Sequence, residues 1–184
     1  MRVLAGAYKG RRLVTPRGST TRPTADQVRI ALMDTLMPRL PGARVLDLFA
    51  GAGGVGLEAL SRGAAHATFV ERDSRAVEAL RRNVETLGVA AYARIERADV
   101  RTALDRLARA GAVFDIVFLD PPYDEDLVTP VLQQLGGSTV AASDVVVIAQ
   151  HLTKKAPPDA HGRLAAFRTR RFGETTLTFF RDGG

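Results

Sequence analysis

Residues 44–56 read RVLDLFAGAGGVG, an apolar run that passes directly into a glycine-rich turn. The run predicts a buried strand over 44–49, and the spacing after the glycines predicts a helix through about Ser61. Glycines allow a tight turn and let the backbone approach a ligand closely. A strand, a glycine turn and a helix in this order predict the first unit of a parallel α/β sheet.

The chain after residue 44 continues this alternation of short apolar runs and amphipathic stretches. Further strands are expected at 67–71, 93–98, 114–119 and 144–149. Helices are expected between them, at 74–87, 100–110 and 127–135. Two last runs, 164–171 and 175–180, predict a closing antiparallel hairpin. The pattern therefore predicts an α/β fold built on one sheet.

The first forty residues differ in character from the rest. Residues 2–5 and 11–14 flank a turn, which predicts a basic hairpin. A loop rich in Ser, Thr and Pro follows and leads to a helix from Ala25 to about Met37. Pro38 is expected to end this helix.

Positive charge is concentrated near the start of the chain. Residues 1–44 hold nine basic and two acidic residues, whereas the whole chain has a formal net charge of +6. We therefore expect residues 1–40 to form a basic extension that contacts a polyanion, and residues 41–184 to form the main domain. A solvated basic surface is the alternative interpretation.

The glycine turn itself fits two kinds of cofactor. Gly51, Gly53 and Gly56 satisfy the pattern G-x-G-x-x-G, which suits a dinucleotide as well as S-adenosylmethionine. Glu71 lies 20 residues after Gly51, at the end of the second expected strand. A carboxylate there can accept hydrogen bonds from the ribose hydroxyls of either cofactor. The glycine turn and Glu71 therefore leave the cofactor open.

Two further acids separate these cofactors. Asp47 lies inside the first expected strand, where it would repel a pyrophosphate but can face the cationic methionine part of S-adenosylmethionine. Asp99 follows the third strand and can accept from the adenine amino group, with a helix N-cap as its alternative role. Burying Asp47 without a partner would be costly, which favours a cationic ligand. The expected cofactor contacts lie on the glycine turn and the strand ends: Asp47, Phe49, Ala50, Gly51, Gly53, Gly56, Glu71, Asp99 and Asp120.

The most specific motif is Asp120-Pro121-Pro122-Tyr123, at the end of the fourth expected strand. An exocyclic amine on a purine is a poor nucleophile because its lone pair is delocalised into the ring. The Asp120 carboxylate and the Pro121 carbonyl can accept its two N–H hydrogens and direct the lone pair at a sulfonium methyl, without a metal. Pro122 stiffens the turn, and Tyr123 can stack on an unstacked base. The motif predicts four catalytic residues, with a proline turn packed by Tyr123 as the alternative.

The composition excludes several other classes of protein. The chain has no cysteine, which excludes disulfides, thiolate metal sites and thiol nucleophiles. The usual route to methylation at C5 of a pyrimidine, through a covalent thiol adduct, is excluded as well. No stretch is apolar enough for a signal peptide or a membrane span, so we expect a soluble cytoplasmic protein without a membrane partner.

At these motifs the chain resembles the RsmD-type 16S ribosomal RNA guanine-N2 methyltransferases. The resemblance covers nearly the whole chain and is carried by residues 2–6, 9–13, 22–24, 46–51, 56–63, 71, 83 and 118–123. It implies a Rossmann-like, seven-stranded methyltransferase sheet with helices on both faces and a small N-terminal hairpin and helix extension. It also implies S-adenosylmethionine as methyl donor, S-adenosylhomocysteine as product, and one guanine of 16S rRNA in an assembling 30S particle as target. The protein is expected to be a monomer.

The basic extension supplies the expected RNA contacts. Lys9, Arg11, Arg12 and Arg22 are candidates for phosphate contacts, and Tyr8 is a candidate for stacking on a base. Arg22 has a structural role in its loop as an equally supported alternative.

Two positions depart from the family pattern. Ile30 stands where such proteins carry a glutamate, and Gln150 stands where they tend to end the fifth strand with an acid. No substrate contact is assigned to either position. Two other functions remain open: an adenine-N6 nucleic-acid methyltransferase, which the same tetrapeptide would serve, and a non-catalytic RNA-binding assembly factor, which the intact Asp120 motif disfavours.

Overall fold

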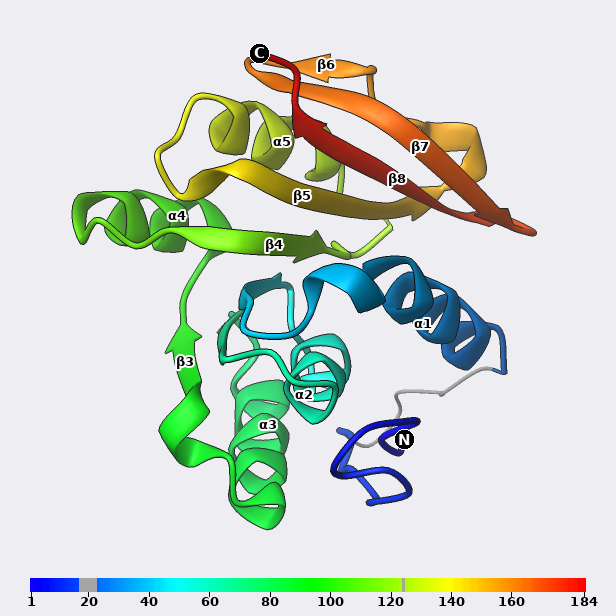
Figure 1. Ribbon diagram of the computed structural model, residues 1–184, viewed down its shortest axis with the longest axis vertical. Coiled ribbons are helices and arrows are strands. Elements are labelled where there is room, and N and C mark those ends of the chain that lie inside the picture. The colour runs from blue at the N-terminus through cyan, green and yellow to red at the C-terminus, as the bar shows by residue number, and fades with distance from the viewer. Residues whose placement is uncertain (17–22, 124) are drawn as a thin grey trace.

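The computed structural model describes residues 1–16, 23–123 and 125–184, so the predicted phosphate contact Arg22 lies outside the described residues. These residues form one eight-stranded sheet with helices on both faces (Figure 1). The strands are β1 Arg44–Leu48, β2 His66–Glu71, β3 Ala93–Arg97, β4 Phe114–Leu119, β5 Ala141–Leu152, β6 Ala160–His161, β7 Leu164–Phe172 and β8 Thr175–Asp182. The α-helices are α1 Pro23–Leu36, α2 Gly54–Ser61, α3 Ser74–Leu87, α4 Val100–Arg109 and α5 Val128–Gly136. Short 3-10 helices occupy Met37–Arg39, Ala90–Tyr92 and Thr153–Lys155.

The strand order in the sheet is β3-β2-β1-β4-β5-β8-β7-β6. Strands β1 to β5 pair in parallel, whereas β8 is antiparallel to both of its neighbours, β5 and β7. The chain therefore runs outward from β1 through β2 and β3, and then crosses to β4 and β5 on the other side of β1. In such sheets a crevice forms at the carboxyl ends of the strands where the order reverses. The topology thus places a ligand site between β1 and β4.

The sheet of the described residues has one strand more than the seven that were expected. Strand β6 pairs with β7 at the edge of the sheet, where Ala160 lies opposite Ala165 and His161 opposite Leu164. Two residues cannot show the alternation of apolar and polar side chains from which a strand is predicted. The predicted strand number is therefore wrong by this edge strand, while the α/β fold with helices on both faces is confirmed.

Alternate residues of the central strands face opposite sides of the sheet. Val45 and Ile116 pack in one buried cluster with apolar residues of α1, α2 and α3. Val117 and Val147 pack in a second cluster with residues of α4 and α5. Figure 1 accordingly shows α4 and α5 on one side of the sheet and α1 and α2 on the other. Both faces are covered, as a parallel sheet requires.

The N-terminal segment, residues 1–16, lies against the helices of the first cluster. Arg2 and Arg12 form a single antiparallel bridge, and the backbone N–H of Leu13 donates to the carbonyl of Met1 over 2.9 Å. The predicted hairpin is therefore present as one bridge and a few backbone hydrogen bonds, without two regular strands. Val3 and Leu13 are buried in the same cluster as Leu32 of α1. Among the described helices, none combines the length and apolarity that a membrane crossing requires.

Candidate active site

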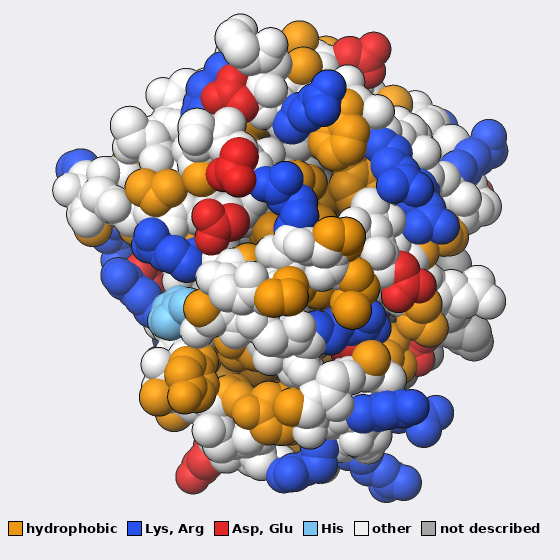
Figure 2. All heavy atoms as spheres, viewed as in Figure 1, with side chains coloured by type: hydrophobic (Ala, Val, Ile, Leu, Met, Phe, Trp, Pro, Cys, Tyr) orange, Lys and Arg blue, Asp and Glu red, His pale blue; other side chains and the backbone are white. Residues whose placement is uncertain are grey.

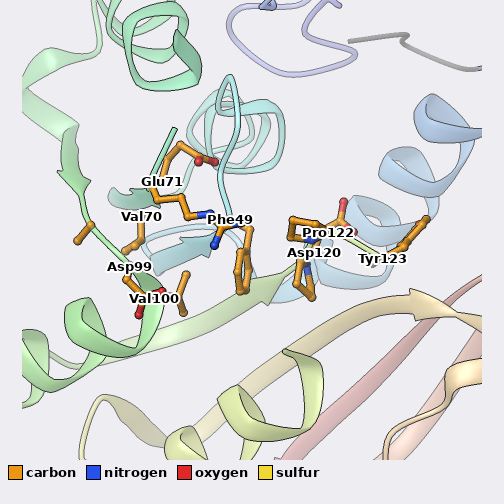
Figure 3. A pocket seen from close by; sticks show the side chains of 11 residues that line it. Phe49, Val70, Glu71, Asp99, Val100, Asp120, Pro122 and Tyr123 are labelled. Atoms are coloured by element: carbon orange, nitrogen blue, oxygen red, sulfur yellow. The ribbon is translucent and has the colours of Figure 1, made fainter. Parts of the chain in front are cut away.

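Carboxylates gather at the carboxyl edge of four neighbouring strands. Asp47 lies in β1, Glu71 ends β2, Asp99 follows β3 and Asp120 follows β4. Because these strands are parallel neighbours, the four side chains come to one edge of the sheet. Figure 3 shows Glu71, Asp99 and Asp120 around one pocket, with the ring of Phe49 among them.

A cavity of about 370 Å³ lies at this edge. Seven of the predicted site residues line it, namely Phe49, Glu71, Asp99, Asp120, Pro121, Pro122 and Tyr123. Arg72 also lines this cavity and forms an ion pair with Glu125, which connects the end of β2 to the segment after the tetrapeptide. The structure thus brings the predicted ribose, adenine and base contacts to one cavity.

A second cavity, of about 350 Å³, shares two of these residues with the first. Phe49 and Asp120 line both cavities. The predicted cofactor contacts Asp47, Ala50 and Gly51 line the second cavity. Asp120 therefore stands where the two cavities meet.

Gly53 and Gly56 are not among the residues that line either cavity. Gly53 has a φ of +85°, and a Cβ built on it would lie 2.4 Å from Cδ1 of Leu80. A Cβ built on Gly56 would lie 2.3 Å from the ring of Phe69. These two glycines let the start of α2 pack closely against α3 and β2, and so they shape the turn that faces the ligand.

Glu71 holds the glycine turn in place. Its Oε2 accepts a hydrogen bond from the Gly51 N–H over 2.8 Å, and its Oε1 accepts one from the Asp73 N–H over 2.8 Å. Just before this turn Phe49 has a φ of +63°, a left-handed conformation that is rare for an aromatic residue. Such strain persists where the surrounding structure imposes it, and here it places the Phe49 ring between the two cavities.

Burial perturbs two carboxyl groups at the site. Burial raises the pKa of Asp47 to about 7, although its Oδ2 accepts a hydrogen bond from the Gly56 N–H over 2.8 Å. Repulsion from Asp120 and Glu71 adds to this rise in the pKa of Asp47. Burial likewise raises the pKa of Asp120 to about 7. A cation bound between these two groups would favour their ionised forms and lower both pKa values.

These shifts predict how the stability of the ligand-free protein depends on pH. The folded state holds protons on Asp47 and Asp120 that the unfolded chain releases near pH 3.8, so the free energy of unfolding should fall as pH rises from about 4 to about 7. Asp120→Asn removes one of the two groups and should raise the free energy of unfolding at pH 8 by roughly 1–3 kcal/mol. Urea denaturation at pH 5 and pH 8 measures both effects.

The control for this experiment is Asp115→Asn, at the amino end of the same strand, where Oδ2 of Asp115 accepts from the Arg44 N–H over 2.7 Å. This variant should keep the wild-type difference between pH 5 and pH 8. An Asp120→Asn variant with the wild-type pH dependence would contradict the raised pKa of Asp120.

Asp99 combines its two expected roles. Its Oδ1 accepts from the backbone N–H groups of Arg101, over 3.0 Å, and Thr102, which makes it the N-cap of α4. The residue also lines the first cavity. The cap uses Oδ1 in both hydrogen bonds, so Oδ2 is not committed to it.

Three polar groups hold Tyr123 at the rim of the first cavity. Its hydroxyl lies 3.4 Å from Oγ1 of Thr175 and accepts a hydrogen bond from Nε2 of Gln150 over 3.4 Å. Nζ of Lys155 donates to the Tyr123 carbonyl over 3.2 Å. The residue is 41% exposed, so part of it faces solvent although its hydroxyl has two partners. Gln150, one of the two departures from the family pattern, therefore contacts a predicted catalytic residue.

The predicted RNA contacts that the structure describes lie on the N-terminal segment. Lys9, Arg11 and Arg12 are exposed, and Nη2 of Arg11 donates to the Thr86 carbonyl of α3 over 2.6 Å. Tyr8 is half-buried and packs at the margin of the first buried cluster. Figure 2 shows Lys and Arg side chains gathered over the N-terminal segment at the lower edge of this face.

A comparison with protein-family models assigns the chain to a known family. The family described as Conserved hypothetical protein 95 matches residues 1–181. The chain belongs to this family, the RsmD-type methyltransferases. The resemblance carried by the sequence motifs is thereby confirmed.

Two relatives, one of them a putative rRNA methyltransferase, and one solved structure match along most of their length. YlbH of Bacillus subtilis (strain 168) is 36% identical over 184 residues, which cover 100% of both chains. Ribosomal RNA small subunit methyltransferase D of Escherichia coli (strain K12) is 32% identical over 180 residues, which cover 98% of this chain and 89% of that protein. A solved structure of a hypothetical protein from Thermus thermophilus superposes with a TM-score of 0.85 at 33% identity, covering 98% of this chain and 99% of that one.

In this RsmD-type chain a buried glutamate on α2 anchors the N-terminal segment, a role that the sequence analysis missed. Glu58 is 1% exposed, and its carboxylate accepts from the backbone N–H groups of Leu4 over 2.8 Å and Ala5 over 2.9 Å. Oγ of Ser61 accepts from the Tyr8 N–H over 3.0 Å. An acid inside the otherwise apolar helix sequence GVGLEALS was the available indication, because a buried carboxylate needs partners.

Asn83 of α3, one of the positions that carry the family resemblance, makes a second anchor. Its Oδ1 accepts from the Val14 N–H over 2.7 Å, and its Nδ2 donates to the carbonyls of Val14 and Ala52, each over 2.9 Å. One side chain thus connects the N-terminal segment to the glycine turn.

Proposed function

We propose that the chain binds S-adenosylmethionine at the carboxyl edge of its sheet and transfers the methyl group to the exocyclic N2 of a guanine in 16S rRNA. Its membership of the RsmD-type family makes it a methyltransferase. One observation carries the proposal: Asp120 lines both cavities, so it would lie beside the methyl group of a donor whose adenosine occupies the first cavity and whose methionine part occupies the second.

The residues at the site fit this donor, which supplies an electrophilic methyl group on a positively charged sulfur. Glu71 at the end of β2 would accept from the ribose hydroxyls, and Asp99 from the adenine amino group. Asp47 would face the cationic end from the second cavity. Burial raises the pKa of Asp47 to about 7, so ionising this carboxyl in the empty site costs free energy, and a cationic ligand would offset that cost. A pyrophosphate would meet the same carboxylates and be repelled.

In the proposed transfer the base nitrogen attacks the methyl carbon, and the carbon–sulfur bond breaks with its electron pair on sulfur. Asp120 and the carbonyl of Pro121 accept the two N–H groups of the amine, which directs its lone pair at the methyl. The nitrogen then loses a proton, which the Asp120 carboxylate can accept because its pKa is about 7. Tyr123, held by Gln150 and partly exposed, offers its ring for stacking on the base.

The proposed RNA target rests on the relatives and on the placement of charge. The printed name of the Escherichia coli relative assigns that protein to small subunit rRNA. In this chain we assign the phosphate contacts to residues 1–40, through Lys9, Arg11, Arg12 and Arg22, with stacking by Tyr8. Residues 41–184 would supply most of the contacts to the donor. The protein would act as a cytoplasmic monomer on an assembling 30S particle.

Transfer of a labelled methyl group to 30S particles, to naked 16S rRNA and to DNA tests this function. Mass spectrometry of the digested nucleosides then identifies the product, with Asp120→Ala as the inactive control. We expect N2-methylguanosine from ribosomal substrate, and none with Asp120→Ala. N6-methyladenosine instead would favour the adenine-N6 alternative. A folded wild-type protein that labels no substrate would favour a non-catalytic assembly factor.

The exposed charges of the N-terminal segment should control the affinity for RNA and leave the affinity for the methyl donor unchanged. Lys9→Gln with Arg12→Gln should raise the KM for RNA several-fold and reduce the slope of log affinity against log salt by about 1 for each phosphate contact that the substitutions remove. Titration of RNA at several salt concentrations measures this slope, and calorimetry should show unchanged affinity for S-adenosylhomocysteine.

The matched control replaces two exposed arginines on α4, which packs on the opposite face of the sheet: Arg106→Gln with Arg109→Gln. The same charge is removed there, and the salt slope should stay at its wild-type value. An equal loss of RNA affinity in both double variants would show that net charge, and not the N-terminal segment, sets the affinity.

A further inference from the structure

A buried arginine beside the second cavity has more donors than partners. Arg29 of α1 is 6% exposed and lines this cavity. Its Nη2 donates to the carbonyl of Arg2 over 2.8 Å and to Oδ1 of Asp26 over 3.0 Å. Its buried Nε has no hydrogen-bond partner among the described residues. Buried polar groups are nearly always satisfied, so the remaining donors of this guanidinium require an explanation.

The start of α2 faces the same guanidinium. A Cβ built on Gly54, the first residue of this helix, would lie 2.8 Å from Sδ of Met1 and 3.2 Å from Nη1 of Arg29. A side chain at this position would therefore clash with Met1 and crowd the guanidinium. The first N–H groups of a helix lack partners within the helix, and those of Gly54 and Val55 have none in the described chain. Hydrogen-bond donors of Arg29 and of the start of α2 thus line one side of the second cavity.

Hydrogen-bond acceptors line another part of the same cavity. Asp47 and Asp120 also line it, and both are carboxyls. The Asp47 carboxylate uses Oδ2 to accept from the Gly56 N–H, which leaves Oδ1 for a cation. The cavity therefore offers donors for an anion and acceptors for a cation, within about 350 Å³. This distribution is complementary to an amino acid, which carries a carboxylate and an ammonium group on one carbon.

We propose that Arg29 binds the α-carboxylate of the methionine part of S-adenosylmethionine, together with the N–H groups at the start of α2, while the ammonium group faces Asp47. The assignment rests on the proposed donor. Arg29 is a positioning residue: it holds the end of the donor that is remote from the methyl, and so fixes where the methyl lies relative to Asp120. A charge-assisted pair between a guanidinium and a carboxylate is strong and directional.

A second buried arginine shows what a purely structural role looks like in this chain. The side chain of Arg62 is 8% exposed, close to the 7% of Arg29. Its Nε donates to Oε1 of Glu58 over 2.9 Å, so this group is satisfied inside the protein. Arg62 is not among the residues that line either of the two site cavities. It therefore provides a matched control for the loss of a buried guanidinium.

The test combines two ligands with two variants in isothermal titration calorimetry. The ligands are S-adenosylhomocysteine and its decarboxylated analogue, which keeps the amine and lacks the carboxylate. Wild-type protein should bind S-adenosylhomocysteine about 10- to 100-fold more tightly than the analogue, the range for a hydrogen bond between charged groups. Arg29→Met should lose this preference by weakening only the carboxylate ligand. Arg62→Met should keep the preference.

Each other outcome overturns the assignment in an identifiable way. If Arg29→Met weakened both ligands equally, its role would be structural, and if the preference persisted, another group would bind the carboxylate. Should Arg29→Met fail to fold, the wild-type comparison still decides, because equal affinity for the two ligands excludes a carboxylate contact. A wild-type protein that bound neither ligand would instead refute the proposed donor, which separates failure of the function from failure of this site.

Discussion

Asp120→Asn should lower the rate of methyl transfer by about 10²- to 10³-fold, the loss that follows removal of one positioned electrostatic contact. The substitution keeps the shape of the side chain but replaces one carboxylate oxygen by an NH₂ group. The NH₂ group donates hydrogen bonds, and it would face an N–H of the base amine, which is also a hydrogen-bond donor. The amine would lose an acceptor and gain a repulsive contact, so its lone pair would no longer be directed at the methyl group.

Single-turnover kinetics with saturating donor measure this loss directly. Affinity for S-adenosylhomocysteine should be nearly unchanged, because its sulfur is neutral and does not need the charge of Asp120. The control is again Asp115→Asn, at the other end of β4, which should keep full activity. An Asp120→Asn variant with more than about a tenth of the wild-type rate would contradict a role for this residue at the reacting amine.

The pH profile of the wild-type rate offers an independent check on the same group. Because burial raises the pKa of Asp120 to about 7, the carboxylate form that accepts N–H groups is lost as pH falls below this value. At limiting donor concentration, where the rate reports the free enzyme, it should therefore increase with pH and level off above about 8, and saturating cationic donor should move the rise to lower pH.

Glu71→Ala should weaken the binding of S-adenosylhomocysteine by at least about 100-fold. In the ligand-free protein the Glu71 carboxylate accepts from the N–H groups of Gly51 and Asp73, each over 2.8 Å. The substitution would leave these groups without their acceptor and release the glycine turn, and it would also remove the expected ribose contact. Hydrogen bonds to a charged group contribute about 1.5–3 kcal/mol each, so two of them account for a loss of this size.

Calorimetry with S-adenosylhomocysteine measures the effect, and Glu78→Gln serves as control because this exposed side chain on α3 pairs only with Arg82 among the described residues. Glu71→Gln should fall between wild type and Glu71→Ala, since an amide keeps one acceptor. If Glu71→Ala lowered the thermal stability but left the affinity unchanged, the carboxylate would only support the turn.

The grouping of the candidate site residues at one edge of the sheet was largely predictable, because these residues lie at strand ends that are marked locally in the sequence. Asp47 and Asp120 interrupt or follow apolar runs, and such runs predict strands without knowledge of the fold. Once the strands are known to be parallel neighbours, their carboxyl ends must meet. The lining of the first cavity by Glu71 and Asp99 follows from this geometry and from no other information.

Other features depend on contacts that no local pattern records. Glu58 accepts a hydrogen bond from the backbone N–H of Leu4, 54 residues earlier. A backbone N–H is present whatever the side chain, so the sequence does not mark Leu4 as the partner. Arg29 lies on a helix for which charge alone indicated an RNA-facing role, whereas its side chain turns inward to the second cavity. The same limitation explains β6, whose two residues are a strand only because β7 lies beside them.

Helix α2, although only eight residues long, contacts both the second cavity and the N-terminal segment. Its first turn borders the second cavity through Gly54, while Glu58 and Ser61 near its end hold residues 4–8. Under the proposed function, a force that RNA exerts on those residues would therefore act on the helix that borders the proposed donor cavity. Binding is thermodynamically reciprocal: if bound RNA raises the affinity for the donor by some factor, the bound donor raises the affinity for RNA by the same factor. If S-adenosylhomocysteine binds more weakly than S-adenosylmethionine, the affinity for the methylated RNA would fall for the same reason.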